Sequence, residues 1–109
     1  MVNRGLVIAL AKEPFREWLQ SLPDPCDVTL EEINEDCTAY LIPEFEDDLQ
    51  RDRVFKKFYD MIFEDQLAGW WTREDDWPQK RDLRTFKKWF ALQFHSVVED
   101  LVDDMLVDE

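Results

Sequence analysis

The chain has 109 residues, of which 26 are Asp or Glu, 13 are Lys or Arg and one is His, so its formal net charge is −13 at pH 7. This length predicts a single domain spanning residues 1–109. A content of 45% hydrophobic and 14% aromatic residues excludes a chain too polar to form a core. No run approaches the ~20 apolar residues of a membrane-spanning helix, and none has the form of a secretory signal. We therefore expect a small, acidic, cytoplasmic protein that does not associate with membranes.

Two short runs are typical of strands. Residues 5–11 (GLVIALA) are continuously apolar, which favours a strand covered on both faces. Residues 37–42 (CTAYLI) are rich in β-forming residues and are followed by Pro43. These runs predict a minimal two-stranded sheet, parallel if the intervening segment is a crossover. Because two strands alone are marginally stable, the sheet must rest on helices or be completed by strands from a second copy in a homodimer.

Two short helices are predicted between these strands. Pro14 fits the first turn of a helix, where its missing N–H leaves no hydrogen bond unmade. The segment 21–27 (SLPDPCD) ends that helix, because its two prolines forbid continuation. Thr29 and Glu32 have the spacing of a capping box, which predicts a second helix over about 30–35.

Two long helices are predicted in the second half of the chain. The first spans about 46–67, with acids near its start and a glycine just after its end. The second spans about 80–105, because apolar residues recur at intervals of three and four, namely Leu83, Phe86, Phe90, Phe94, Val97, Leu101 and Met105. The predicted fold class is therefore α+β, a helix-dominated single domain with a two-stranded sheet and two long C-terminal helices.

The charges are segregated along the chain. Residues 51–57 and 80–88 hold nine basic residues and two acids, whereas residues 99–109 hold six acids and no base. The basic stretches either pair with nearby acids or form an anion site where the two long helices meet. The acidic surplus either serves solubility or steers the chain to a basic protein partner, with DNA mimicry as a special case. Direct binding to nucleic acid is not expected, because a body of this charge repels phosphates.

Three tryptophans lie in the segment between the two long helices. Trp70, Trp71 and Trp77 have arginines nearby, a composition typical of binding hot spots. The alternative is that they close the end of the core, since a small domain needs its largest side chains there. The hypothesis of a non-catalytic interaction or regulatory module makes these tryptophans and the acidic tail the partner-binding candidates: Trp70, Trp71, Trp77, Glu99, Asp100, Asp103 and Asp104.

Motifs for cofactors are missing from the sequence. With Gly5 and Gly69 as its only glycines, the chain has neither a P-loop nor a dinucleotide-binding fingerprint. Cys26 and Cys37 lack the spacing of a zinc site, and both should be free thiols in a reducing compartment. We therefore expect no cofactor, no bound metal and no catalytic residues.

A small metal-dependent enzyme is the rival hypothesis from another class. The single histidine, His95, lies four residues before Glu99, which would place both on one helix face. Asp60 and Glu64 have the same spacing on the preceding helix, so the four side chains would meet if those faces packed together. The spacing differs from the Glu-x-x-His pairs of helical di-metal sites.

Overall fold

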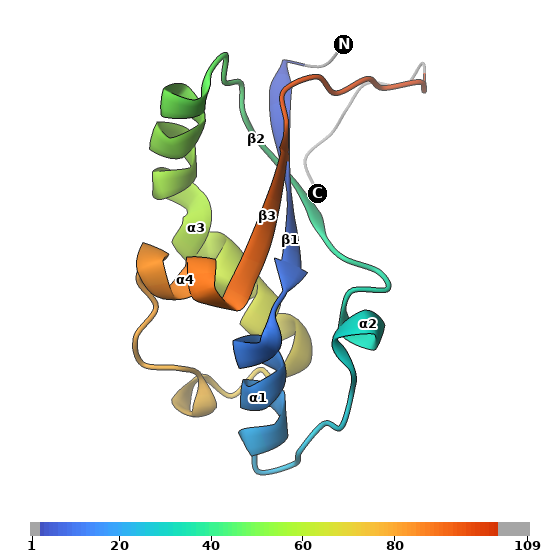
Figure 1. Ribbon diagram of the computed structural model, residues 1–109, viewed down its shortest axis with the longest axis vertical. Helices are drawn as coiled ribbons and strands as arrows, with labels where there is room; N and C mark the ends of the chain where they lie inside the picture. Colours follow the sequence, from blue (N-terminus) through green and yellow to red (C-terminus); the bar gives the residue numbers. More distant parts are fainter. Residues whose placement is uncertain (1–2, 103–109) are drawn as a thin grey trace.

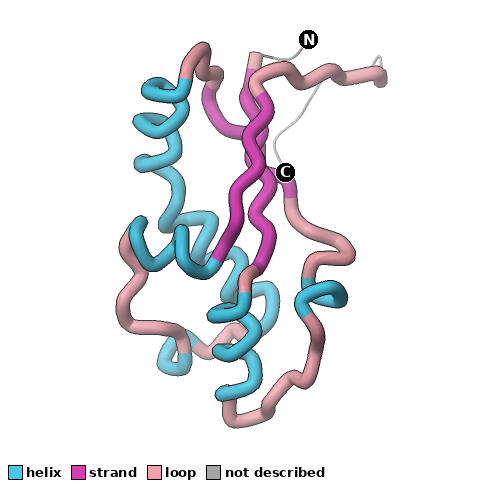
Figure 2. Tube along the Cα trace, in the orientation of Figure 1, coloured by secondary structure: helices cyan, strands magenta, loops and turns pink. Residues whose placement is uncertain are grey.

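The computed structural model describes residues 3–102, which form a three-stranded antiparallel sheet with the longest helix along one side of it (Figure 1). In chain order the elements are β1 (Arg4–Ala11), α1 (Glu13–Ser21), α2 (Leu30–Ile33), β2 (Ala39–Pro43), α3 (Asp48–Trp70), the single-turn η1 (Glu74–Asp76), α4 (Leu83–Trp89) and β3 (Phe90–His95). The strand order is β2–β1–β3, so β1 lies at the centre and pairs antiparallel with both neighbours (Figure 2).

The central strand alternates between two faces. Val7, Ala9 and Ala11 are buried on the face that meets the helices, while the residues between them are only half-buried. Successive side chains of a strand point to opposite faces, so a continuously apolar run gives β1 one face for the core and a second apolar face. This confirms the expected strand at residues 5–11.

The third strand corrects the predicted sheet. The expected helix over 80–105 is wrong, because α4 ends at Trp89 and residues 90–95 form β3 along the free edge of β1. Phe90, Leu92 and Phe94 face the core and alternate with exposed residues, so the run also fits a strand. A spacing of four between Phe90 and Phe94 suits both a helix and a strand. The tertiary context decides, because β1 offers an unpaired edge there.

Two further expectations about the sheet are also wrong. The sheet has three strands rather than two, and its pairing is antiparallel rather than parallel. Because β3 of the same chain pairs with the second edge of β1, the sheet needs no strand from a second copy. That removes the reason first given for a homodimer.

The other helices follow the sequence signals. The helix expected over 46–67 is confirmed as α3, the only long helix among the described residues, but Gly69, which was expected just after its end, lies inside it. Asp47 caps its start, since its carboxylate accepts a hydrogen bond from the Gln50 amide at 2.8 Å. The capping box of Thr29 and Glu32 is present at α2.

The core joins α3, α4 and β3 through aromatic rings. Phe86 is fully buried, and the ring centroids of Phe55, Phe63 and Phe90 lie 5.5, 5.4 and 4.9 Å from its own. The pair with Phe90 is stacked and the other two are tilted or edge-to-face, and such pairs stabilise a core beyond the apolar area they bury. They fix α3 across the sheet and thereby set the spacing between α3 and the edge strand β2.

The start of β2 is positioned by an asparagine. The Asn34 side chain accepts a hydrogen bond from the Ala11 amide at 2.8 Å and donates one to the Ala11 carbonyl at 3.0 Å. The side-chain amide of Asn34 thus pairs with both backbone groups of Ala11, the last residue of β1, as the backbone of a neighbouring strand would. The segment that leads into β2 is thereby held against the sheet.

Candidate functional site

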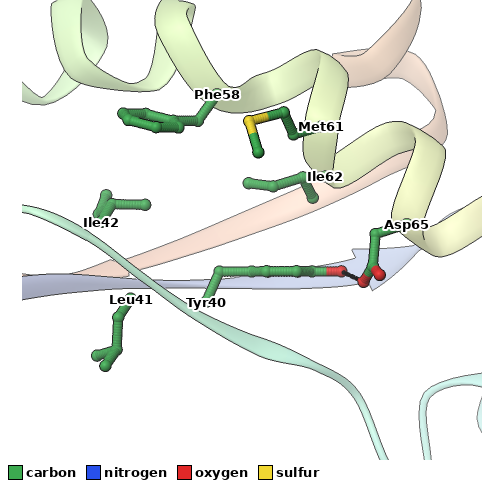
Figure 3. A pocket seen from close by; sticks show the side chains of 7 residues that line it. All are labelled: Tyr40, Leu41, Ile42, Phe58, Met61, Ile62 and Asp65. Atoms are coloured by element: carbon green, nitrogen blue, oxygen red, sulfur yellow. Dashed lines mark hydrogen bonds between the residues drawn. The ribbon is translucent and has the colours of Figure 1, made fainter. Parts of the chain in front are cut away.

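A hollow of about 370 Å³ lies between the edge strand β2 and helix α3 (Figure 3). Its lining consists of six residues with apolar or aromatic side chains and one acid: Tyr40, Leu41, Ile42, Phe58, Met61, Ile62 and Asp65. Figure 3 shows the side chains of α3 reaching toward the strand below them. The arrangement forms an apolar groove with one charged group at its side.

The groove reaches the free edge of β2. Tyr40 and Ile42 point toward α3, while Leu41 points to the opposite face of the sheet (Figure 3). A hollow that touches all three must extend around the strand's edge. Within residues 3–102, β2 pairs with β1 alone, so its outer edge has no strand partner. Leu41 and Met61 are 45% and 63% exposed, which leaves apolar surface open at the mouth of the groove.

A hydrogen-bonded group closes one end of the apolar lining. The Tyr40 hydroxyl donates to a carboxylate oxygen of Asp65 at 2.5 Å and accepts from the Gln66 side-chain amide at 2.8 Å. Burial of the phenol, followed by its hydrogen bond to Asp65, raises the pKa of Tyr40 well above its ordinary value of 10.0. The phenol therefore stays protonated, and Asp65 is held in place as a fixed negative charge beside the groove.

A second hollow of about 340 Å³ continues from Asp65 toward the end of α3. It is lined by Ala9, Ile33, Asn34, Asp36, Cys37, Thr38, Asp65, Gln66, Gly69 and Trp70. The two charged residues among these, Asp36 and Asp65, are both acids. Trp70 lies at the far side and is 38% exposed. Carboxylates beside an accessible indole are the groups that bind a lysine or arginine side chain.

The three predicted tryptophans have different surroundings. Trp77 is buried in the core, and its indole N–H donates to the Trp71 carbonyl at 2.7 Å. The half-buried Trp71 donates its own indole N–H to the Asp76 carboxylate at 3.0 Å. Trp71 and Trp77 therefore close the end of the core, whereas Trp70 lines the second hollow.

The predicted acidic residues after β3 that the structure describes do not lie on a helix. Residues 96–102 are irregular, and both Glu99 and Asp100 are exposed. The Asp100 carboxylate accepts a hydrogen bond from the Val102 amide at 2.9 Å. Asp103 and Asp104 lie outside the described residues.

The structure removes the helical spacing behind the metal-enzyme hypothesis. His95 is the exposed last residue of β3 and Glu99 belongs to the irregular segment, so the two do not share a helix face. Asp60 and Glu64 remain on α3, where both are exposed. Across residues 3–102, no three His, Cys, Asp or Glu side chains are grouped so as to hold a metal ion. In the same range both cysteines are free thiols.

The comparisons add no relative to this description. The chain matches no protein-family model, no curated protein and no solved structure. A membrane-spanning helix, which must be both long and apolar, does not occur in the part of the chain from residue 3 to residue 102.

Sequence reasoning missed the groove residues on β2 and α3. Met61 gives the strongest signal in the sequence, because it is an apolar residue with two acids, Glu64 and Asp65, three and four positions further along the same helix face. Leu41 gives no signal of its own, since an apolar residue in a strand is ordinarily assigned to the core. Whether β2 is an edge strand depends on the sheet order, which only the fold establishes.

Proposed function

We propose that the protein is an interaction module that binds an extended segment of a partner protein along the outer edge of β2. The observation that carries the proposal is the unpaired edge of β2 opening onto the apolar groove beside α3. We assign this non-catalytic role to the cytoplasm, in line with the sequence-based expectation.

An edge strand beside a groove suits the addition of a further strand. The free amide and carbonyl groups of the edge supply main-chain hydrogen bonds, and alternate side chains of the added segment enter the groove. The five residues of β2 span about 17 Å at the rise of an antiparallel strand. Pro43 has no N–H to donate, so pairing is expected over the part of the strand before it.

The charges at the groove select a basic segment. Asp65 lies between the apolar and polar hollows, Asp36 is in the polar hollow, and the accessible Trp70 is beside it. A ligand with an apolar side chain opposite Met61 would fill the apolar hollow. A lysine or arginine of the same ligand near Asp65 would pair with the acids of the polar hollow. The net charge of −13 adds long-range attraction for a basic partner, which raises the rate of association. These features support the basic protein partner that the sequence predicts.

The test is selection from a random peptide library displayed on phage, followed by affinity measurements with variants of the groove. Peptides that alternate apolar residues with others and carry a lysine or arginine are expected. Met61→Glu should lower the affinity for the selected peptides by at least about tenfold, because it places a charge in the apolar lining of the groove. Leu49→Glu is the matched control, since Leu49 is also an exposed residue of α3, at 75%, and does not line the groove.

Two further measurements separate this mode of binding from others. Asp65→Asn should lower both the affinity and its dependence on salt, since it removes the charge and keeps an acceptor for Tyr40. N-methylation of alternate peptide amides should abolish binding, because it removes main-chain donors. Selection of no peptide, or equal binding to the Met61 and Leu49 variants, would refute the proposal.

A further inference from the structure

A third hollow, of about 390 Å³, lies where α3, α4 and β3 meet. Its lining combines four apolar or aromatic residues with three bases and one acid: Phe55, Leu83, Leu92, Phe94, Arg51, Lys56, Lys87 and Asp52. The hollow therefore has a net positive charge, whereas the chain as a whole has a net charge of −13.

The three bases of this basic hollow are not equivalent. The Arg51 guanidinium carbon lies 4.9 Å from the Phe94 ring centroid, and its nitrogens lie 3.4 Å from Asp48 and 3.1 Å from Asp52. Arg51 is thus already held by neighbours. Lys56 and Lys87 are exposed, and no described carboxylate lies within 4.0 Å of either ammonium group. They are available to bind an external anion.

The C-terminal segment of the chain, residues 96–109, has the complementary chemistry. It carries six acids and no basic residue from Glu99 onward. Its described part also exposes large apolar side chains, since Leu101 is 95% exposed and Val97 and Val102 are each 64% exposed. These three residues lie within six positions of one another, so the segment offers several apolar side chains that a second surface can bury.

The direction of the described part of this segment, residues 96–102, favours the hollow of another copy. After β3 the chain turns away from the side of the strand on which α3 and α4 lie (Figure 1). To enter its own basic hollow, the segment would have to reverse over the end of the sheet. The hollow of another molecule requires no such reversal.

We propose that the C-terminal segment of one copy docks in the basic hollow of a second copy, and that the exchange is reciprocal. Acids of the segment then pair with Lys56 and Lys87, and its apolar side chains cover Leu83, Leu92 and the aromatic rings. A reciprocal exchange uses the same two surfaces on both copies, so it closes as a two-fold dimer rather than a filament. This inference uses a different surface from the proposed peptide groove and does not depend on it.

Net repulsion between two acidic copies does not prevent this contact. Charges separated by more than about 8 Å are largely screened at physiological salt, whereas ion pairs formed in the hollow are in direct contact. The dimer should therefore be weakest at very low salt, where the repulsion acts at long range.

Sedimentation velocity of the full chain is the test, with variants that reverse charge. Lys56→Glu with Lys87→Glu reverses the hollow and should weaken dimerisation by about tenfold or more. Lys57→Glu with Lys88→Glu is the matched control, since it changes the net charge equally on the same two helices outside the hollow. This control should change the dimer affinity by less than about threefold.

A charge swap makes the test specific for the segment. Asp103→Lys, Asp104→Lys, Asp108→Lys and Glu109→Lys together change the charge of residues 99–109 from −6 to +2. This variant should also weaken the dimer, and mixing it with the hollow-reversed variant should restore association as a heterodimer. Circular dichroism and urea unfolding of each variant establish that the chain remains folded. A wild-type chain that stays monomeric at every soluble concentration would overturn the inference. A hollow-reversed variant that dimerises as well as the control would do the same.

Discussion

The hydrogen bond between Tyr40 and Asp65 gives a quantitative test of the groove's construction. Tyr40→Phe removes the hydroxyl that donates to Asp65 at 2.5 Å and accepts from Gln66 at 2.8 Å, and it keeps the ring. A hydrogen bond to a charged group contributes ~1.5–3 kcal/mol when its loss leaves that group buried. Because Asp65 is exposed and regains water, we expect a smaller loss of about 1 kcal/mol in unfolding free energy at pH 7.

The raised pKa of Tyr40 predicts how this difference depends on pH. Its pKa is 10.0 in the unfolded chain and higher in the folded one, because burial and the Asp65 hydrogen bond favour the neutral phenol. Below pH 10 both states hold the proton, so the full stabilisation is present. Above pH 10 the unfolded state releases the proton first, and stability falls by about 1.4 kcal/mol per pH unit. The advantage of wild type over Tyr40→Phe should therefore vanish near pH 11.

Urea unfolding followed by tryptophan fluorescence measures both quantities. Wild type and Tyr40→Phe are compared at pH 7, 9, 10 and 11, and the contributions of all other titrating groups cancel in the difference. The reasoning is refuted if the two proteins are equally stable at pH 7. It is also refuted if a difference at pH 7 persists unchanged at pH 11.

Three further substitutions test the fold by urea unfolding. Phe86→Ala should cost about 4 kcal/mol, because it empties a fully buried site; a loss under about 1 kcal/mol would contradict this packing. Asn34→Ala should cost ~1–3 kcal/mol, since it leaves both backbone groups of Ala11 without their partner, and an unchanged midpoint would exclude that role. Hydrogen bonds from Thr85 hold the pKa of Asp82 below 3.8, a stabilisation present above that pH and lost as pH falls. Wild type should therefore be more stable than Asp82→Asn at pH 7 and should lose that advantage as the pH falls below 3.8, whereas a constant difference would contradict the assignment.

The sequence alone predicted the elements that have local signals. The Thr29 capping box and Pro14 located the short helices, and the apolar run at 5–11 located the central strand. Helix α3 was predicted from the acids near its start and from its period of 3.6 residues, whereas Gly69, the expected stop, lies inside the helix. Each of these signals acts within a few residues, so it can be read without knowledge of the fold.

Residues 90–95 show where local signals stop being sufficient. The pattern of Phe90, Leu92 and Phe94 suits a strand, and Phe90 and Phe94 also continue a helical seam. Only the unpaired edge of β1 decides between them, because pairing there satisfies backbone groups that a helix would leave open on β1. The wrong choice gave a two-stranded sheet and therefore a wrong reason for a dimer.

The candidate site was determined by tertiary structure. Charge and composition predicted an acidic protein with a basic partner. Among the predicted binding residues, Trp70 alone lines the second hollow, which adjoins the groove at Asp65. The groove itself depends on β2 being at the edge of the sheet and on α3 crossing beside it. Met61 and Leu41 are twenty residues apart in sequence, and only the packing of α3 against the sheet brings them to one surface. A binding site made from two separate elements has no local signal, because its parts acquire their relation only when the chain folds.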